Sequence, residues 1–204
     1  MLTKIRNILK KKNKIKIVSL TAYSKNIAKI LDKYCDITLV GDSLANALYG
    51  MKNTHQLSLN TIILHSISVK AAVKKSLMVV DMPKGTYKNP RQAKKNAKLI
   101  FDKTKCDAVK IESNNKNFKI IREIIKNKIP VMGHIGYTPQ FKNKFKIEEK
   151  KKKEIKKLLK EAISIEKAGA FSIVLECITP STAKLITKSL KIPTIGIGSS
   201  SHCD

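Results

Sequence analysis

The sequence predicts a (β/α)8 barrel of the TIM type, of which this chain of 204 residues supplies seven β/α units. Short apolar runs alternate with longer helical patterns along the chain. The runs are nearly continuous in apolar residues, as in parallel strands that are covered on both faces. Five of them have an acid or a base at or next to their carboxyl end. In a barrel those ends meet at one mouth, whereas a doubly wound sheet concentrates its site at one or two loops.

The strand candidates are short runs rich in Ile, Val and Leu. They occupy residues 15–20, 37–41, 77–81, 108–112, 130–135, 171–176 and 193–198. The remaining residues, 199–204, follow the last run directly. We therefore expect a barrel whose eighth strand and helix are missing from this chain, which would leave a strand edge exposed.

Helical patterns fill the intervals between the strand candidates. Within residues 24–34, Ile27, Ile30 and Leu31 fall on one helical face, and Ser24 is the candidate N-cap. Comparable apolar stripes occupy residues 59–75, 89–103, 117–128 and 154–170. Residues 1–204 are expected to form a single barrel domain, in which the basic, amphipathic residues 1–14 make a leading helix and linker.

The net charge of +27 raises the question of a nucleic-acid partner. Of the 42 basic residues only Arg6, Arg91 and Arg122 are arginine, the side chain that phosphate and base-edge recognition favours. The lysines are spread over every segment, and no nucleic-acid-binding motif is present. We expect solvated lysines and no specific nucleic-acid partner.

Membrane-spanning runs, a secretory signal and paired cysteines are the sequence features that bear on cellular location. No apolar run approaches the length that crosses a bilayer, and the start lacks the apolar core of a secretory signal. The four cysteines are far apart and show no metal-finger spacing, as expected for reduced thiols. A cytoplasmic protein without a membrane partner is the prediction. The acid-free start leaves a targeting segment as the alternative.

Three carboxylates, Asp42, Asp81 and Glu112, follow the second, third and fourth strand candidates. For any one of them alone, capping of the next turn is the simpler interpretation. Together at a barrel mouth they would repel one another, and a cation would remove that cost. Hard oxygen ligands with room for water suit Mg²⁺ better than Zn²⁺. The sequence therefore predicts a magnesium site formed by these three residues.

Three further side chains are candidates for chemistry. Lys110 precedes Glu112 by two residues, so both point to the same side of a strand, which in a barrel is the interior. A buried lysine needs a partner, either these carboxylates or an anionic substrate; the alternative is a surface lysine on an edge strand. Glu176 ends an apolar strand and is a candidate general base, or a partner for a nearby lysine. His134 either orients a substrate or is a structural histidine.

Several sequence blocks, taken in order, resemble ketopantoate hydroxymethyltransferase (3-methyl-2-oxobutanoate hydroxymethyltransferase), a family of the pantothenate pathway. The order matches that of the family, and the blocks cover nearly the whole chain. They are TAY (21–23), LVGDSL (39–44), VVDMP (79–83), AVKIE (108–112), GHIGYTPQ (133–140), AGA with VLEC (168–177) and IPTIGIG (192–198).

This resemblance implies a barrel of the phosphoenolpyruvate/pyruvate superfamily, assembled into a homo-oligomer that is commonly a decamer. It also implies Mg²⁺ and 5,10-methylenetetrahydrofolate, whose one-carbon unit would be transferred to 3-methyl-2-oxobutanoate through a Mg²⁺-stabilised enolate to give 2-dehydropantoate. Two alternatives stay open. One is a Mg²⁺-dependent oxo-acid lyase or mutase of the same superfamily, and the other is an inactive truncated remnant.

The resemblance also implies roles for individual residues. A metal site would be formed by Asp42, Asp81 and Glu112, and the 2-oxo acid would be held by Asp42, Ser43, Asp81 and Lys110. Glu176 would accept the proton. His134, and Tyr23 of the TAY block, are second-tier candidates for the same site.

The chain departs from the family pattern in four places. Ala45 replaces the glycine of GDSLG, and Lys84 replaces the aromatic residue after DMP. The segment 141–154, FKNKFKIEEKKKKE, is shorter than the family's loop and has no glycine. We expect this change to impair loop closure or folate binding. The family also continues through an eighth strand and helix beyond the position of Asp204.

Overall fold

The computed structural model describes residues 2–114, 117–142 and 151–204. Its strands form one seven-stranded parallel sheet in which each strand pairs with the next one along the chain. The strands are β1 (Ser19–Thr21), β2 (Ile37–Val40), β3 (Leu77–Asp81), β4 (Ala108–Glu112), β5 (Val131–Gly136), β6 (Ser172–Glu176) and β7 (Thr194–Ile197). Sequential parallel pairing with helices in between is the arrangement of a (β/α) barrel, and the predicted fold class is confirmed.

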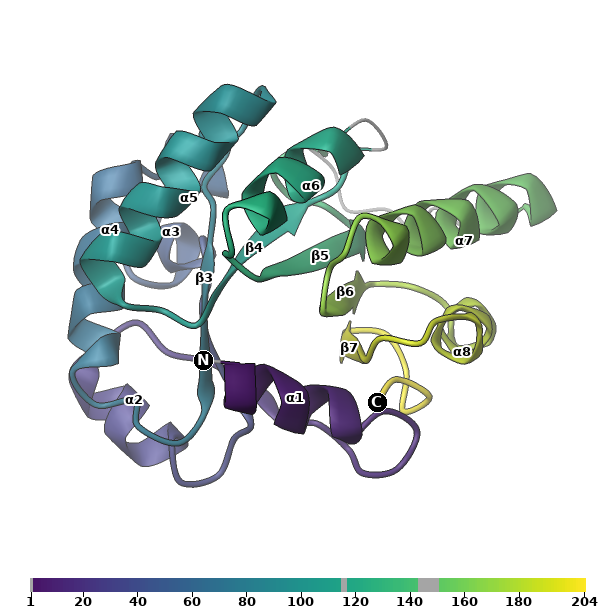
Figure 1. Ribbon diagram of the computed structural model, residues 1–204, viewed down its shortest axis with the longest axis horizontal. Coiled ribbons are helices and arrows are strands. Elements are labelled where there is room, and N and C mark those ends of the chain that lie inside the picture. The colour runs from purple at the N-terminus through teal and green to yellow at the C-terminus, as the bar shows by residue number, and fades with distance from the viewer. Residues whose placement is uncertain (1, 115–116, 143–150) are drawn as a thin grey trace.

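Helices connect consecutive strands and cover the outside of the sheet (Figure 1). They are α1 (Leu2–Lys10), α2 (Lys25–Leu31), α3 (Leu44–Ala47), the 3₁₀ helix η1 (Thr54–Gln56), α4 (Leu59–Lys70), α5 (Pro90–Thr104), α6 (Phe118–Lys126), α7 (Lys152–Lys167) and α8 (Pro180–Ser189). Within the described ranges no helix combines the length and apolar character needed to cross a membrane. The four cysteines are thiols rather than disulfides.

Two elements differ from their sequence-based predictions. On α2 the buried residue is Ala28, and of the expected stripe only Leu31 packs against the core, whereas Ile27 and Ile30 are 48% and 57% exposed. Ser24 occupies the N-cap position, but its side chain makes no capping hydrogen bond. The first strand begins at Ser19 rather than at residue 15, because the amide of Ile15 closes a turn onto Lys11 O.

Helix α8 was absent from the predicted helices. Two of its buried residues, Thr182 and Thr187, are polar, and only Ala183 and Ile186 complete the buried face. This face is too short in apolar residues to show the helical period clearly. In the structure the helix packs against α7.

Helix α1 covers the amino-terminal end of the barrel. Its Ile5 and Ile8 are buried in the same apolar cluster as Ile37 and Leu77, the first residues of β2 and β3. In Figure 1 this helix lies across one end of the sheet. Lys4 adds a hydrogen bond of 2.8 Å from Nζ to Ser76 O. The opposite end of the barrel, where the strands reach their carboxyl ends, is not covered by α1.

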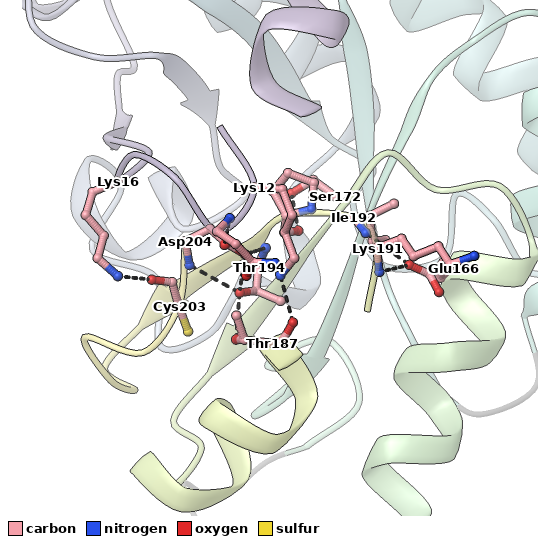
Figure 2. A network of polar contacts seen from close by, with 12 residues as sticks. Lys12, Lys16, Glu166, Ser172, Thr187, Lys191, Ile192, Thr194, Cys203 and Asp204 are labelled. Carbon is pink, nitrogen blue, oxygen red and sulfur yellow. Dashed lines mark hydrogen bonds and ion pairs between the residues drawn. The ribbon is translucent and has the colours of Figure 1, made fainter. Parts of the chain in front are cut away.

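Asp204 joins the segment that precedes β1 to the start of β7. Its carboxylate accepts hydrogen bonds from Lys12 Nζ at 2.7 Å and from Thr194 N at 2.9 Å (Figure 2). It also accepts one from Asn13 N at 2.8 Å. Its backbone oxygen accepts from Ile17 N at 2.7 Å. The two outer strands of the sheet are thereby tied to each other at their amino-terminal ends.

Candidate active site

The inner faces of the strands change from apolar to charged toward their carboxyl ends. Alternate residues of a strand point to the same side. On β3, Leu77 and Val79 belong to the buried cluster inside the barrel, and Asp81 is the next residue on that face. On β6, Val174 is likewise followed by Glu176. The period that builds the core therefore also aims these carboxylates into the mouth of the barrel.

A cavity of ≈ 620 Å³ lies at these strand ends. It collects nearly all side chains that the sequence singled out, because they end neighbouring strands. Its lining includes Asp42, Ser43, Asp81, Lys110, Glu112, His134 and Glu176. The remaining candidate, Tyr23, lies next to it, with its hydroxyl 2.7 Å from Ser43 Oγ.

Lys110 is tied to a carboxylate, one of the two interpretations that the sequence left open. Its Nζ donates to Asp81 Oδ1 at 2.6 Å, and both side chains are buried. Burial by itself would lower the pKa of Lys110. The negative charges of Asp81, Glu112 and Asp42 outweigh it and raise the pKa above its usual value, so the side chain stays an ammonium.

The carboxylates are crowded and poorly solvated. Asp42 is 4% exposed, and its backbone N–H donates to Asp81 Oδ2 at 3.0 Å. Burial, followed by the charge of Asp81, raises the pKa of Asp42 to about 6. Burial also raises the pKa of Glu112 to about 8, with Asp42 and Asp81 adding to the effect. The crowded acids therefore tend to hold protons, and a further cation could take the place of those protons.

Gln140, which the sequence did not single out, connects two of these acids. Its Nε2 donates to Asp42 Oδ2 at 2.8 Å and to Met82 O at 3.0 Å. Its backbone N–H donates to Glu112 Oε2 at 2.9 Å, and Tyr87 donates its hydroxyl proton to Gln140 Oε1 at 2.5 Å. Gln140 is the last residue of the GHIGYTPQ block, and this position was the only feature of the sequence that could have marked it as a site residue.

His134 lies between two carboxylates. Its Nε2 is 3.1 Å from Glu176 Oε2, and its Nδ1 is 3.7 Å from Glu112 Oε1. Neither contact has the geometry of a full hydrogen bond. Burial and the neighbouring charge of Lys110 lower the pKa of His134, against the attraction of Glu176. The ring is therefore a neutral imidazole beside Glu176.

A glycine fixes the place of Glu176. Gly136 has φ +94°, and a Cβ there would overlap Glu176 O. The next residue, Tyr137, donates its N–H to the same oxygen at 2.9 Å. At 19% exposure the side chain of Glu176 is the most accessible acid of the cavity with an ion-pair contact. It is thus open to a ligand while its backbone is held.

Part of the cavity wall comes from the segment between α3 and α4, where the sequence offered no periodic pattern. Asn53, Thr54 and His55 line the cavity from this side. His55 Nε2 lies 2.8 Å from Pro139 O, and its Nδ1 lies 3.1 Å from Lys84 Nζ. Lys84, one of the departures from the family pattern, is therefore held at the rim. Most of the altered loop, residues 143–150, lies outside the described residues.

The residues present fit a divalent cation in part. Among the residues that the structure describes, no group of three or more His, Cys, Asp or Glu converges as a ligand set. Asp42 and Asp81 are neighbours, and Gln140 donates to one oxygen of Asp42 and to one of Glu112. Mg²⁺ commonly takes one or two carboxylates and completes its shell with water and substrate. The buried Asp42–Asp81 pair matches that chemistry.

Fold and cavity together define a barrel enzyme whose site is built from acids and one lysine at the strand ends. Comparison with known proteins identifies the family. The family model for ketopantoate hydroxymethyltransferase matches residues 2–204. The chain belongs to this family of transferases, as the sequence blocks predicted.

Relatives named 3-methyl-2-oxobutanoate hydroxymethyltransferase support this assignment. The protein of Pelagibacter ubique (strain HTCC1062) is 57% identical over 201 residues, which is 98% of this chain and 78% of that protein. The protein of Anaplasma marginale (strain Florida) is 44% identical over 207 residues, covering 100% of this chain and 75% of the relative.

Solved structures show the same fold at low identity. A putative phosphonomutase from Burkholderia cenocepacia J2315 superposes with a TM-score of 0.74 at 12% identity, covering 95% of this chain and 82% of that one. A 2,3-dimethylmalate lyase of the PEP mutase/isocitrate lyase superfamily gives 0.69 at 13% identity, covering 94% and 70%. The predicted barrel fold is thereby confirmed.

Proposed function

We propose that this chain transfers a hydroxymethyl group from 5,10-methylenetetrahydrofolate to 3-methyl-2-oxobutanoate, giving 2-dehydropantoate. The observation that carries the proposal is the buried contact of 2.6 Å between Lys110 and Asp81, with Asp42 beside it in the cavity. Such a cluster can hold an anionic 2-oxo acid and the charge that develops on its ketone oxygen. The substrate itself is inferred from the names of the relatives.

A magnesium ion is part of the proposal, and Asp42 and Asp81 would hold it. When bound, Mg²⁺ supplies Lewis-acid polarisation of the substrate's ketone. Glu112 lies in the same cavity and would act from the outer shell, through Gln140 and water. This arrangement is supported by the mutual repulsion of the acids, which a dication relieves.

The chain's own groups would then move the protons. Glu176 would remove the proton from the carbon next to the ketone, and the neutral His134 beside it would orient its carboxylate. The ammonium of Lys110 would stabilise the negative charge as it develops on the enolate oxygen. Ser43, whose hydroxyl contacts Tyr23, is placed to hold the substrate's carboxylate.

The folate co-substrate supplies the carbon. The one-carbon unit is bridged to two folate nitrogens, and both carbon–nitrogen bonds break as its carbon bonds to the enolate carbon and to the oxygen of water. The proton removed from the substrate and one proton from water end on the two nitrogens, and tetrahydrofolate leaves. The family description names the hydroxymethyl transfer, and the folate donor is part of the proposal.

We also propose that the chain forms a homo-oligomer. Helix α4 carries no charged residue from Leu59 to Val69, although 28% of the chain is charged. Its Leu64 and Ile67 are 59% and 45% exposed, and they lie on the helix that packs against α2. Two chains of charge +27 can approach closely only where lysines are few. The stretch of α4 from Leu59 to Val69 meets that condition, whereas α2 carries the exposed Lys25 and Lys29.

The decisive experiment is turnover of 3-methyl-2-oxobutanoate with 5,10-methylenetetrahydrofolate and Mg²⁺, with Asp81→Ala as the inactive control. Formation of 2-dehydropantoate by the parent chain alone would support the proposal. Cleavage of an oxo acid without folate would favour the lyase alternative. A folded chain without either activity would indicate a remnant.

A further inference from the structure

We propose that Gln140 is a positioning residue: it holds the carboxylates of Asp42 and Glu112 apart and in fixed orientations for a divalent cation. The identity of the ligands rests on the proposed function, but the role of Gln140 is argued from its own contacts. The residue was not among the site residues predicted from the sequence.

Every polar group of Gln140 that faces the cavity side is in use. The residue is 1% exposed, and its side-chain amide donates to Asp42 Oδ2 and to Met82 O. Its backbone N–H donates to Glu112 Oε2. One residue from the segment after β5 thereby reaches acids that end β2 and β4, on either side of β3.

The direction of the amide is determined by a fixed acceptor. Met82 O can only accept a hydrogen bond, so the NH₂ group of Gln140 must face it. Rotation by half a turn would bring Gln140 Oε1 against both Met82 O and the carboxylate of Asp42. The remaining side, Oε1, then requires a donor, and the hydroxyl of Tyr87 supplies it. Tyr87 is 5% exposed and so acts as a buried anchor.

A neutral donor is the right chemistry between two acids. A lysine at this position would compete with a metal for the same carboxylates, and a glutamate would add a further negative charge. An amide satisfies one oxygen of Asp42 and, through its backbone, one oxygen of Glu112, and it adds no charge of its own. The second oxygen of Asp42 then keeps a fixed direction. Such outer partners set metal affinity in other proteins.

The test compares Mn²⁺ binding, followed by electron paramagnetic resonance of the free ion, in the parent chain and in Gln140→Leu, Gln140→Glu and Tyr87→Phe. We expect Gln140→Leu to weaken binding by about 10- to 100-fold. Tyr87→Phe removes only the distal hydrogen bond and should weaken it by about fivefold. Gln56→Leu, at an exposed position of η1, is the matched control and should bind as the parent does.

Turnover provides a second readout. If Gln140 acts by positioning, excess Mg²⁺ should restore most of the kcat of Gln140→Leu, whereas a folding defect would not respond to the metal. Should Gln140→Leu fail to fold, the single hydroxyl removed in Tyr87→Phe decides the question by the same titration.

The outcomes separate this inference from the proposed function. Mn²⁺ affinity of Gln140→Leu within twofold of the parent would overturn the positioning role, as would a parent chain that binds no Mn²⁺. Weakened binding together with a parent that transfers no hydroxymethyl group would support the role of Gln140 and refute the proposed reaction.

Discussion

Lys110 and Asp81 form an ion pair across two neighbouring strands, with Nζ and Oδ1 2.6 Å apart and side chains 5% and 4% exposed. The two residues are register partners of β4 and β3. Their side chains therefore meet without a loop having to place them. The pair is part of the sheet as well as of the cavity, so its removal should affect stability and activity in different proportions.

The first prediction concerns this asymmetry. Lys110→Met leaves three buried acids without their cation, and we expect the free energy of unfolding to fall by about 3–5 kcal/mol in metal-free buffer. Asp81→Asn should lower the free energy of unfolding by less, because it also relieves the repulsion between Asp81 and Asp42. Urea denaturation of the two variants measures the difference. Equal losses would contradict the view that the site carries excess negative charge.

The second prediction assigns proton removal to Glu176. Glu176→Gln keeps the shape of the side chain but cannot accept a proton, so exchange of the hydrogen next to the ketone of 3-methyl-2-oxobutanoate should slow by about 10²- to 10⁴-fold. Deuterium incorporation from D₂O, followed by NMR without folate, isolates this step. Glu123→Gln, on the partly exposed face of α6, is the control. Unchanged exchange in Glu176→Gln would assign the proton to another base.

Strand-end residues were the predictable part of the site. Asp81, Glu112 and Glu176 end runs whose apolar residues mark the strand, so the same period places them on the inner face. Gln140 comes from a turn and His55 from the short 3₁₀ helix η1, and neither segment has an apolar period, so only tertiary structure brings them to the cavity. Sequence reasoning found the acids and missed the amide between two of them.

The helices were predictable in so far as their buried faces are apolar. Helix α5 shows this clearly, since Ala93, Ala97 and Ile100 recur at helical spacing on its buried side. On α2 the same reasoning placed Ile27 and Ile30 inward, and the structure exposes both. The spacing of apolar residues shows which of them share one face of a helix, but it does not show whether that face packs against the core or faces solvent.

The third prediction tests the support of Glu176 by its neighbour on β5. Gly136→Ala introduces a Cβ that overlaps Glu176 O at a φ of +94°. We expect a loss of about 2–4 kcal/mol in stability and at least a tenfold fall in kcat, because the general base is displaced. Gly50→Ala is the matched control: it also has positive φ, but no atom lies within 4 Å of its Cβ. Gly50→Ala should lower the free energy of unfolding by about 1 kcal/mol and leave kcat unchanged. Similar losses in both variants would show that backbone conformation alone is responsible.

The fourth prediction concerns the pH dependence of the Asp204 network. Burial would raise the pKa of Asp204, but hydrogen bonds from Lys12, Asn13 and Thr194 outweigh it and hold the pKa below its ordinary value of 3.8. A depressed pKa means that the ionised form stabilises the fold above the unfolded pKa, and that this contribution is lost as the pH falls through the folded value.

Asp204→Asn should therefore lower the free energy of unfolding by about 2–4 kcal/mol near neutral pH. The difference from the parent should shrink below about pH 4. Denaturation curves at several pH values measure it. A difference that is independent of pH would mean that packing, and not the charge of Asp204, ties the two outer strands together.

The fifth prediction tests self-association through the exposed side of α4. Leu64 is 59% exposed on an uncharged stretch of helix, and Leu64→Lys would place two like charges in a contact between copies. We expect the variant to sediment as a smaller species than the parent at the same concentration. Leu185→Lys, at a 42% exposed position of α8, is the control and should keep the parent's oligomeric state. If Leu64→Lys leaves the mass unchanged while Leu185→Lys reduces it, the copies meet at α8 instead, and a monomeric parent would refute self-association altogether.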